Sequence, residues 1–402
     1  MRPDPLKSYG CQTLDEADIQ AVAEALRGQY LTGGPIVRNF ELALERMTGA
    51  AHAVSCGNCT QGLHMAAHVL GAGPETSVIV PSVTFLATAN APESLGADIV
   101  FADVDPENGL MQPEHFEAAV RRCPSRPVAV MPVHLAGQVV DMKAVHGIAS
   151  RHGIKIIEDA AHAIGTVYED GGKARRVGDC SFSDATAFSF HPVKNMTTGE
   201  GGAVLVRDAG MAAKLRRLRS HGMVREADQF VDGDAGFDKA GDANPWYYEM
   251  SVPGYNYRLT DIQAALGISQ LAKLETFVET RLRLKKKYDE LLFPYADIVR
   301  PVKASGNCKP AWHLYIVLID FERLGTERSY VMKALLENGI ASQVHYIPVH
   351  RQPYYKAKNP DLKLPGAEEY YARSLTLPLH VNMDEGHVER VVGTLVKILG
   401  GK

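Results

Sequence analysis

The chain has 402 residues, of which 46% are hydrophobic and 22% charged, as is usual for a globular enzyme large enough for two domains. Its net charge is −4, whereas proteins that bind nucleic acid are usually basic. No apolar stretch is long enough to span a membrane. The first residues lack the apolar core of a signal peptide, so we expect a cytoplasmic enzyme without a nucleic-acid or membrane partner.

From about residue 50 the chain alternates short β-rich segments with helical patterns, which is typical of a mainly parallel sheet covered by helices. The predicted strands are apolar enough to be buried on both faces, as a parallel sheet requires. These strands are Val78–Val80, Asp98–Phe101, Val128–Val133, Ile154–Glu158, Ala185–Phe190 and Ala203–Val206. The helices predicted beside them are Gly62–Leu70, Ala87–Leu95 and Met142–Arg151.

After residue 260 the pattern changes and predicts a smaller α+β domain. Apolar residues at helical spacing predict one long amphipathic helix over Thr260–Leu292. The elements predicted after it are a strand at Leu314–Ile319 and helices near Tyr330–Glu337 and Glu385–Ile398. We therefore expect a large domain over residues 1–260, followed by an interdomain helix and a small domain over 261–402. The polar stretch Val224–Asn244, rich in Gly and Asp, is predicted to be a mobile surface insertion.

Two pairs of residues have the spacing of metal or redox sites. Cys56 and Cys59 form a C-x-x-C pattern, but a zinc site needs a second ligand pair that the sequence lacks. A redox role stays open, although two reduced cysteines in a tight turn are favoured. His64 and His68 lie four residues apart on a predicted helix, without a glutamate between them or an evident third ligand. We therefore expect no metal site.

Two features are typical of a phosphorylated, ring-containing ligand. Gly57–Thr60 precedes a predicted helix, whose free amide groups and positive dipole end can hold a phosphate. Asn and Thr at such a position also serve simply as helix caps. Phe85 follows a predicted strand, where an aromatic side chain can stack on a cofactor ring or belong to the core.

The ends of two further strands carry an acid and a lysine. In a parallel sheet, ligands bind beyond the carboxyl ends of the strands, where Asp159 can pair with a protonated ring nitrogen or cap the next turn. Lys194 leaves a buried strand just before the glycine-rich stretch Thr197–Gly202, and buried lysines are rare. Desolvation makes such an amine a nucleophile for Schiff-base chemistry. An Asp followed about 35 residues later by such a Lys indicates a pyridoxal phosphate enzyme.

With these motifs in place, the chain resembles the DegT/DnrJ/StrS family of nucleotide-sugar aminotransferases. The resemblance rests on four motifs and runs from about Tyr9 to the last predicted helix. The motifs are Glu158–Ala163, Phe188–Lys194, Thr198–Gly202 and Gly254–Leu259. It implies an α/β fold of the PLP-dependent transferase fold type I, with a mainly parallel seven-stranded sheet and a smaller α+β C-terminal domain. It also implies the cofactor pyridoxal 5'-phosphate (PLP) and a homodimer with shared active sites.

The resemblance implies two catalytic residues. Lys194 would bond to the cofactor aldehyde and move a proton between the substrate and the cofactor, and Asp159 would pair with the pyridinium nitrogen. The other implied cofactor contacts are Phe85 on the ring, His162 near the ring hydroxyl, Cys59, Thr60 and Ser189 on the phosphate, and Asn256 on the phosphate of the neighbouring subunit. Cys59 departs from the family, which usually has Gly or Ala at that position.

A finer resemblance points to the branch of the family that acts in pseudaminic acid biosynthesis. It rests on Pro245–Met250, Gln343–His350 and Gln352–Tyr355. It implies transfer of the amino group of L-glutamate to C4 of a UDP-linked 4-keto-6-deoxy-N-acetylhexosamine, the altrosamine precursor. The implied substrate residues are Arg27, Tyr30, Thr32, His313, Tyr315, His345 and Tyr346. Several of these side chains can equally belong to strand packing.

The sequence leaves alternative substrates open and argues against three other classes of protein. The closest alternatives are amination of UDP-4-keto-6-deoxy-GlcNAc and of the GDP-perosamine precursor. In the related sugar dehydratases a histidine replaces the lysine, whereas Lys194 is present here. A non-catalytic PLP-binding regulator is expected to lose Lys194 or Asp159, and a Rossmann dehydrogenase needs an N-terminal G-x-G-x-x-G that the chain lacks.

Overall fold

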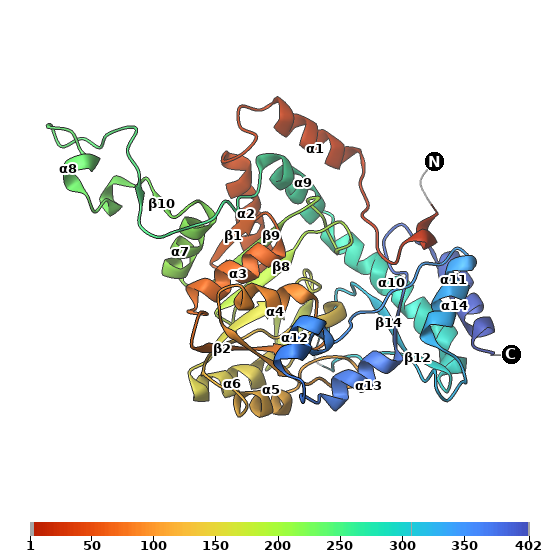
Figure 1. Ribbon diagram of the computed structural model, residues 1–402. Helices are drawn as coiled ribbons and strands as arrows, with labels where there is room; N and C mark the ends of the chain where they lie inside the picture. Colours follow the sequence, from red (N-terminus) through yellow and green to blue (C-terminus); the bar gives the residue numbers. More distant parts are fainter. Residues whose placement is uncertain (1–3, 307, 401–402) are drawn as a thin grey trace.

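The computed structural model describes residues 4–306 and 308–400 and contains a seven-stranded sheet with helices on both faces (Figure 1). The strand order is β1-β9-β8-β5-β4-β2-β3, and only β9 runs antiparallel to its neighbours. The strands are β1 His52–Cys56, β2 Thr76–Pro81, β3 Asp98–Ala102, β4 Arg126–Val130, β5 Lys155–Asp159, β8 Ala185–Ser189 and β9 Gly202–Val206. The predicted mainly parallel sheet is therefore confirmed.

The helices around this sheet belong to the first 220 residues. They are α1 Glu16–Arg27, α2 Pro35–Thr48, α3 Cys59–Val69, α4 Leu86–Glu93, α5 Pro113–Val120, α6 Met142–His152 and α7 Ala209–Arg219. Sequence reasoning found α3, α4 and α6 but not strand β1. That strand reads His-Ala-Val-Ser-Cys and has a single β-branched residue, so its composition gives little strand signal although it is almost wholly buried.

The prediction of one long helix over Thr260–Leu292 is wrong. The structure has two helices, α9 Asp261–Leu271 and α10 Leu274–Leu292. The break falls at Ala272 and Lys273, without a glycine or proline to mark it. There the Nζ atom of Lys273 contacts carboxylate oxygens of Asp15 and Asp18 at 2.7 and 2.6 Å, so tertiary ion pairs with the start of α1 hold the turn.

The C-terminal part is built on a three-stranded antiparallel sheet of order β12-β14-β15, seen beside α10 and α14 in Figure 1. Its elements are β12 Val299–Pro301, β14 Tyr315–Ile319, β15 Ser374–Leu377, α11 Arg328–Glu337, α12 Pro353–Lys358, α13 Pro365–Arg373 and α14 Glu385–Ile398. A further small sheet joins the two parts of the chain, with strands β6 Val167–Asp170, β7 Lys173–Arg176 and β13 Cys308–Lys309. The domain boundary at residue 260 stays a prediction.

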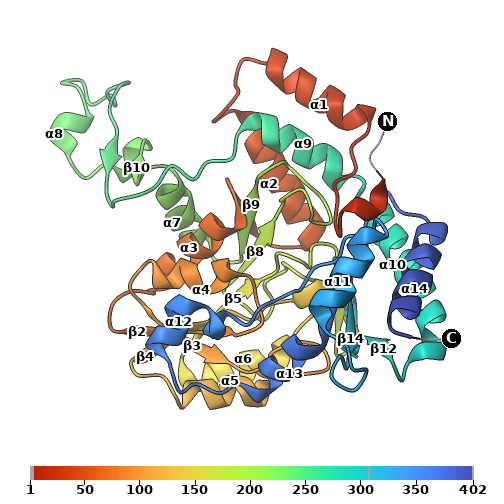
Figure 2. The same ribbon diagram turned by 45° about the vertical axis from the view of Figure 1, so that its right-hand side comes forward.

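The predicted insertion forms an arm, residues 223–250, that projects from the body beyond α7 (Figures 1 and 2). The arm holds β10 Met223–Val224, α8 Gly233–Gly236 and β11 Glu249–Met250. A small aromatic cluster of Phe230, Phe237 and Tyr247 supports its tip. Its surface position is as predicted, while its mobility stays a prediction.

The described residues also contain five short 3-10 helices: Pro5–Lys7, Leu135–Gly137, Ala227–Gln229, Phe293–Tyr295 and Val349–Arg351. Over the described ranges, no helix combines the length and the apolar character that a membrane crossing requires.

Candidate active site

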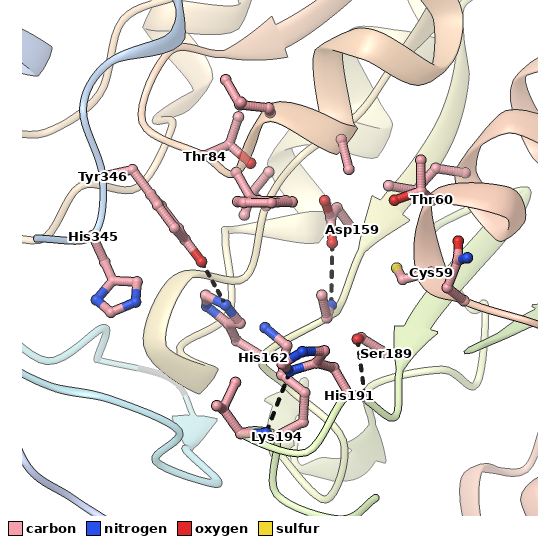
Figure 3. Close-up of a pocket in the computed structure, with 18 of the residues that line it drawn as sticks. Cys59, Thr60, Thr84, Asp159, His162, Ser189, His191, Lys194, His345 and Tyr346 are labelled. Atoms are coloured by element: carbon pink, nitrogen blue, oxygen red, sulfur yellow. Dashed lines mark hydrogen bonds between the residues drawn. The ribbon is translucent and has the colours of Figure 1, made fainter. Parts of the chain in front are cut away.

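A cavity of about 650 Å³ lies at the carboxyl ends of β5 and β8 and beside the start of α3. In Figure 3 the segment that carries His345 and Tyr346 faces these strand ends across the cavity. Segments far apart in the sequence therefore meet here, at the edge of the sheet where parallel α/β folds bind their ligands.

Asp159, the last residue of β5, lies at the bottom of this cavity and is 5% exposed. One of its carboxylate oxygens accepts a hydrogen bond of 2.6 Å from the hydroxyl of Thr88, and the other accepts one of 3.2 Å from the amide of Ala161. These two donors fix the carboxylate in one orientation. The carboxylate can bind a positively charged ring nitrogen in the cavity.

Lys194 lies in the turn after β8, where its amide donates to the carbonyl of His191 at 2.9 Å. Its side chain lines the cavity (Figure 3). Desolvation lowers the pKa of this amine to about 8, against smaller opposite effects of Cys59 and Asp159. Because the proton leaves near neutral pH, the amine can act as a nucleophile and as a proton carrier.

The start of α3 forms an anion-binding end of the cavity. Asn58 caps the helix by accepting from the amide of Gln61 at 2.9 Å, while within the described chain the amides of Cys59 and Thr60 donate to no acceptor. Gly202 allows the close approach of β9, because a Cβ there would lie 2.6 Å from the backbone of Asn58 and Cys59. Ser189 lies at the same end of the cavity and adds a hydroxyl group. Together these donors suit a phosphate.

The opposite side of the cavity is formed by neutral polar side chains. His162 Nδ1 accepts from the amide of Ala136 at 3.3 Å, and its Nε2 lies 3.0 Å from the hydroxyl of Tyr346. His345 lies beside Tyr346 and bonds Thr376 at 2.8 Å. Burial lowers the pKa of His345 to about 3 and that of His162 well below its usual range. Both imidazoles are therefore neutral at physiological pH.

Burial also lowers the pKa of His313 well below its usual range. Its ring lies against that of His162, with a centroid distance of 4.4 Å, but it does not reach the cavity wall. The structure thus places His313 directly behind a residue that lines the cavity.

Besides His313, five other predicted site residues lie outside this cavity of their own chain. Arg27, Tyr30 and Thr32 are exposed at the end of α1 and in the loop after it, and Asn256 is exposed in the strand-like segment beside Ser220. Tyr315 is 1% exposed and lies in the core, where its ring stacks on Tyr288 and its hydroxyl bonds Asp289 at 2.9 Å. The substrate and cofactor roles of these residues stay predictions.

Thr84, His191 and Tyr9 are among the cavity residues to which the sequence analysis assigned no role. Thr84 follows β2 directly before Phe85, and the position beside a predicted ring-stacking residue was an available signal. His191, three residues before Lys194, also lines the cavity. Tyr9 comes from the N-terminal segment, far in the sequence from every motif. Phe85 itself directly precedes α4 and has 58% of its surface exposed, so its ring is available to a ligand.

The remaining cysteine and histidine patterns take part in packing. Cys56 and Cys59 are free and buried, and desolvation raises the pKa of Cys56 to about 12 and that of Cys59 well above its usual value. Both are therefore neutral thiols, unlike the thiolates of redox sites. The rings of His64 and His68 pack against Tyr255. The structure describes no group of three metal-ligating side chains in the residues that it covers.

Comparison with known proteins gives a consistent result. The model of the DegT/DnrJ/EryC1/StrS aminotransferase family matches residues 12–396. The spore coat polysaccharide biosynthesis protein SpsC of Bacillus subtilis is 37% identical over 396 residues, which cover 98% of this chain and 97% of that protein. Two solved structures superpose on nearly the whole chain.

The first is Helicobacter pylori PseC, an aminotransferase involved in the biosynthesis of pseudaminic acid, with a TM-score of 0.87 at 28% identity over 98% of this chain and 99% of PseC. The second is Spr1654 of Streptococcus pneumoniae in its PLP form, with a TM-score of 0.84 at 26% identity over 98% of each chain. These likenesses confirm the predicted fold of PLP-dependent transferases.

The chemistry of the cavity suits the cofactor of these relatives. It offers a fixed carboxylate for a pyridinium, a desolvated amine for an aldehyde, and helix amides with a hydroxyl for a phosphate. The chain belongs to the DegT/DnrJ/EryC1/StrS aminotransferase family and is a pyridoxal phosphate-dependent sugar aminotransferase.

Proposed function

We propose that this enzyme moves the amino group of L-glutamate to C4 of a UDP-linked 4-keto-6-deoxy-N-acetylhexosamine and forms UDP-4-amino-4,6-dideoxy-N-acetyl-β-L-altrosamine. The observation that carries the proposal is the likeness to PseC over 98% of the chain, because PseC takes part in the biosynthesis of pseudaminic acid. The segment that contains His345 and Tyr346, on which the sequence resemblance to this branch rests, lines the cavity.

The cofactor-binding roles belong to the same proposal. Bound pyridoxal phosphate supplies an aldehyde that takes up the amino group and a ring that withdraws electrons from the reacting carbon. Asp159 would bind the ring nitrogen, and its negative charge would keep the proton there. Phe85 would cover one face of the ring. The phosphate is held by the amides of Cys59 and Thr60 and by the hydroxyl of Ser189.

Lys194 has two tasks in the proposed mechanism. Its amine is the group that would bond to the cofactor aldehyde, with release of water, and its Nζ would hold and move the proton at the substrate carbon. The lowered pKa of about 8 makes the neutral amine available at physiological pH. Burial of the amine outweighs the smaller opposite effects of Cys59 and Asp159 on this pKa.

Tyr346 is proposed as an oriented hydrogen-bond donor to the sugar. Because His162 Nδ1 accepts from the amide of Ala136, the neutral ring carries its proton on Nε2 and donates it to the Tyr346 oxygen. The hydroxyl proton of Tyr346 is then available to a ligand in the cavity. His162 in this arrangement lies near the cofactor and sets the direction of that donor.

Charge supports a site shared between two subunits. Both substrates are anionic, yet Lys194 is the only lysine or arginine among the described residues that line the cavity, and Glu200 adds a negative charge. Cations for the nucleotide diphosphate must therefore come from elsewhere. We propose a homodimer in which Asn256 reaches the phosphate of the partner's cofactor and the exposed Arg27 lies at the entrance of a shared site.

A second candidate substrate is another nucleotide-linked 4-keto-6-deoxy sugar, such as UDP-4-keto-6-deoxy-GlcNAc or the GDP-perosamine precursor. The 37% identity to SpsC, named for spore coat polysaccharide biosynthesis, favours it. Neutral hydrogen-bond donors on one side of the cavity distinguish these keto sugars by the directions of a few hydrogen bonds. A change of one such side chain can therefore change the preferred sugar.

The visible absorption spectrum of the purified protein tests the proposal. L-glutamate should bleach the cofactor band, and the keto sugar that restores the band identifies the acceptor. Restoration by the altrosamine precursor in preference to the other two sugars is the expected result. Restoration by one of the others alone favours the second candidate, and a band that ignores glutamate contradicts the assigned donor.

A further inference from the structure

We propose that Thr84 and Thr88 form a hydroxyl relay that positions Asp159 against the ring nitrogen of the cofactor. The inference rests on the role proposed for Asp159 and concerns two residues that act through it. Thr88 is the nearer of the two, and Thr84 orients Thr88.

The direction of the relay follows from its hydrogen bonds. The Thr88 hydroxyl donates to Asp159 Oδ2 at 2.6 Å, and this uses its only proton. The hydroxyls of Thr84 and Thr88 are 2.7 Å apart, so Thr84 must be the donor in that pair. The chain of bonds therefore runs from Thr84 through Thr88 to the carboxylate, and each bond polarises the next.

Burial makes these bonds important for the carboxylate. Thr84, Thr88 and Asp159 are 2%, 0% and 5% exposed, so bulk water does not replace a lost donor. Among the described residues the carboxylate has one other donor, the amide of Ala161, at the longer distance of 3.2 Å. Removal of the Thr88 hydroxyl leaves Oδ2 without its partner and lets the carboxylate rotate.

The relay also joins two parts of the proposed cofactor site. Thr84 and Phe85 are adjacent in the connection between β2 and α4, and Thr88 lies in the first turn of α4, four residues after Thr84. Asp159 comes from β5, 71 residues after Thr88. The network thus links the segment that carries Phe85 to the carboxylate of Asp159.

The test compares Thr88→Val, which keeps the shape and loses the hydroxyl, with Thr88→Ser, which keeps the donor. Thr48→Val serves as a control, because Thr48 is also buried and its hydroxyl bonds only backbone groups close to it in the chain: it donates to the carbonyl of Leu44 at 2.8 Å and accepts from the amide of Ala50 at 3.2 Å. Two readouts are measured: the dissociation constant of PLP from the apoprotein, and the pH midpoint of the visible absorption of the loaded enzyme. Circular dichroism and melting temperature verify folding.

We expect Thr88→Val to weaken PLP binding about tenfold and to shift the pH midpoint, as for the loss of a hydrogen bond to a charged group. Thr84→Val should do the same to a smaller extent, and Thr88→Ser and Thr48→Val should resemble the wild type. A folded Thr88→Val protein with unchanged affinity and midpoint overturns the relay alone. Absence of a cofactor band in the wild type overturns the proposed function and the relay with it.

Discussion

The two sides of the cavity differ in how they are built. The side proposed to bind the cofactor consists of the ends of strands in one sheet and the start of helix α3, and the residues that line it, among them Asp159 and Lys194, come from one chain. The side proposed to bind the sugar comes from the segment around His345 and Tyr346, while Arg27, Tyr30 and Thr32 are exposed outside the cavity. Most of the proposed cofactor site thus lies in one chain, with only Asn256 proposed to come from the partner subunit, while the substrate site needs more residues from elsewhere.

The largest effect is expected on the cofactor side, from Lys194→Ala. Loss of the amine removes both the nucleophile and the proton carrier, so turnover should fall about a thousandfold or more. The amination rate of the keto sugar is the measurement, with circular dichroism to verify folding. Substantial turnover by the folded variant would show that another group does this chemistry.

Asp159→Asn should have the second largest effect. The amide keeps the shape but removes the negative charge that faces the ring nitrogen, and we expect kcat to fall about a hundredfold together with weaker PLP binding. Steady-state kinetics and PLP titration measure the two changes. A variant with full activity would place the cofactor ring away from β5.

The pH dependence of cofactor uptake probes the same side. The protonated amine of Lys194 cannot attack the aldehyde, and its pKa is lowered from 10.5 to about 8. The rate at which the apoprotein takes up PLP should therefore rise with pH, about fiftyfold from pH 6 to pH 8, and level off above the pKa. Stopped-flow absorbance gives the profile. A rise that continues to pH 10 would mean that the lysine titrates as if in water.

On the sugar side, Tyr346→Phe should have a smaller effect and a different signature. Loss of one hydroxyl donor should raise KM for the keto sugar about tenfold and leave PLP affinity near that of the wild type. Initial rates at varied sugar concentration and a PLP titration separate the two. An equally large rise in KM for the sugar and in the dissociation constant of PLP would contradict the division of the cavity into a sugar side and a cofactor side.

The smallest change is expected from Tyr315→Phe. Its hydroxyl bonds Asp289 in the core, so its loss should lower the free energy of unfolding by about 1 kcal/mol without a change in KM. Urea denaturation and steady-state kinetics are the measurements. A raised KM with unchanged stability would instead return Tyr315 to the substrate residues.

The same contrast explains how much could be predicted from the sequence. Asp159 and Lys194 end apolar strands, and the edge at which parallel strands end follows from topology, so their meeting in one cavity could be foreseen. The bond between Thr88 and Asp159 could not, because no local pattern relates residues 71 positions apart. Strand β1 was missed because its residues have weak strand preference.

Two further differences between the sequence prediction and the structure are caused by tertiary contacts. Lys273 has ordinary helix propensity, and the break between α9 and α10 depends on its ion pairs with α1, which are distant in sequence. Tyr315 occupies a strand whose residues are all buried, so an aromatic residue there packs in the core as readily as it lines a cavity. Motifs therefore located the chemistry, whereas packing decided which neighbouring side chains reach it.

The most direct test of the account is to find which lysine bonds to the cofactor. The PLP-loaded enzyme is reduced with borohydride, digested, and analysed by mass spectrometry for the phosphopyridoxyl group. We predict one modified peptide, with the group on Lys194. Modification of a different lysine, or none in protein that carries the cofactor, would contradict the assignment of this cavity as the active site.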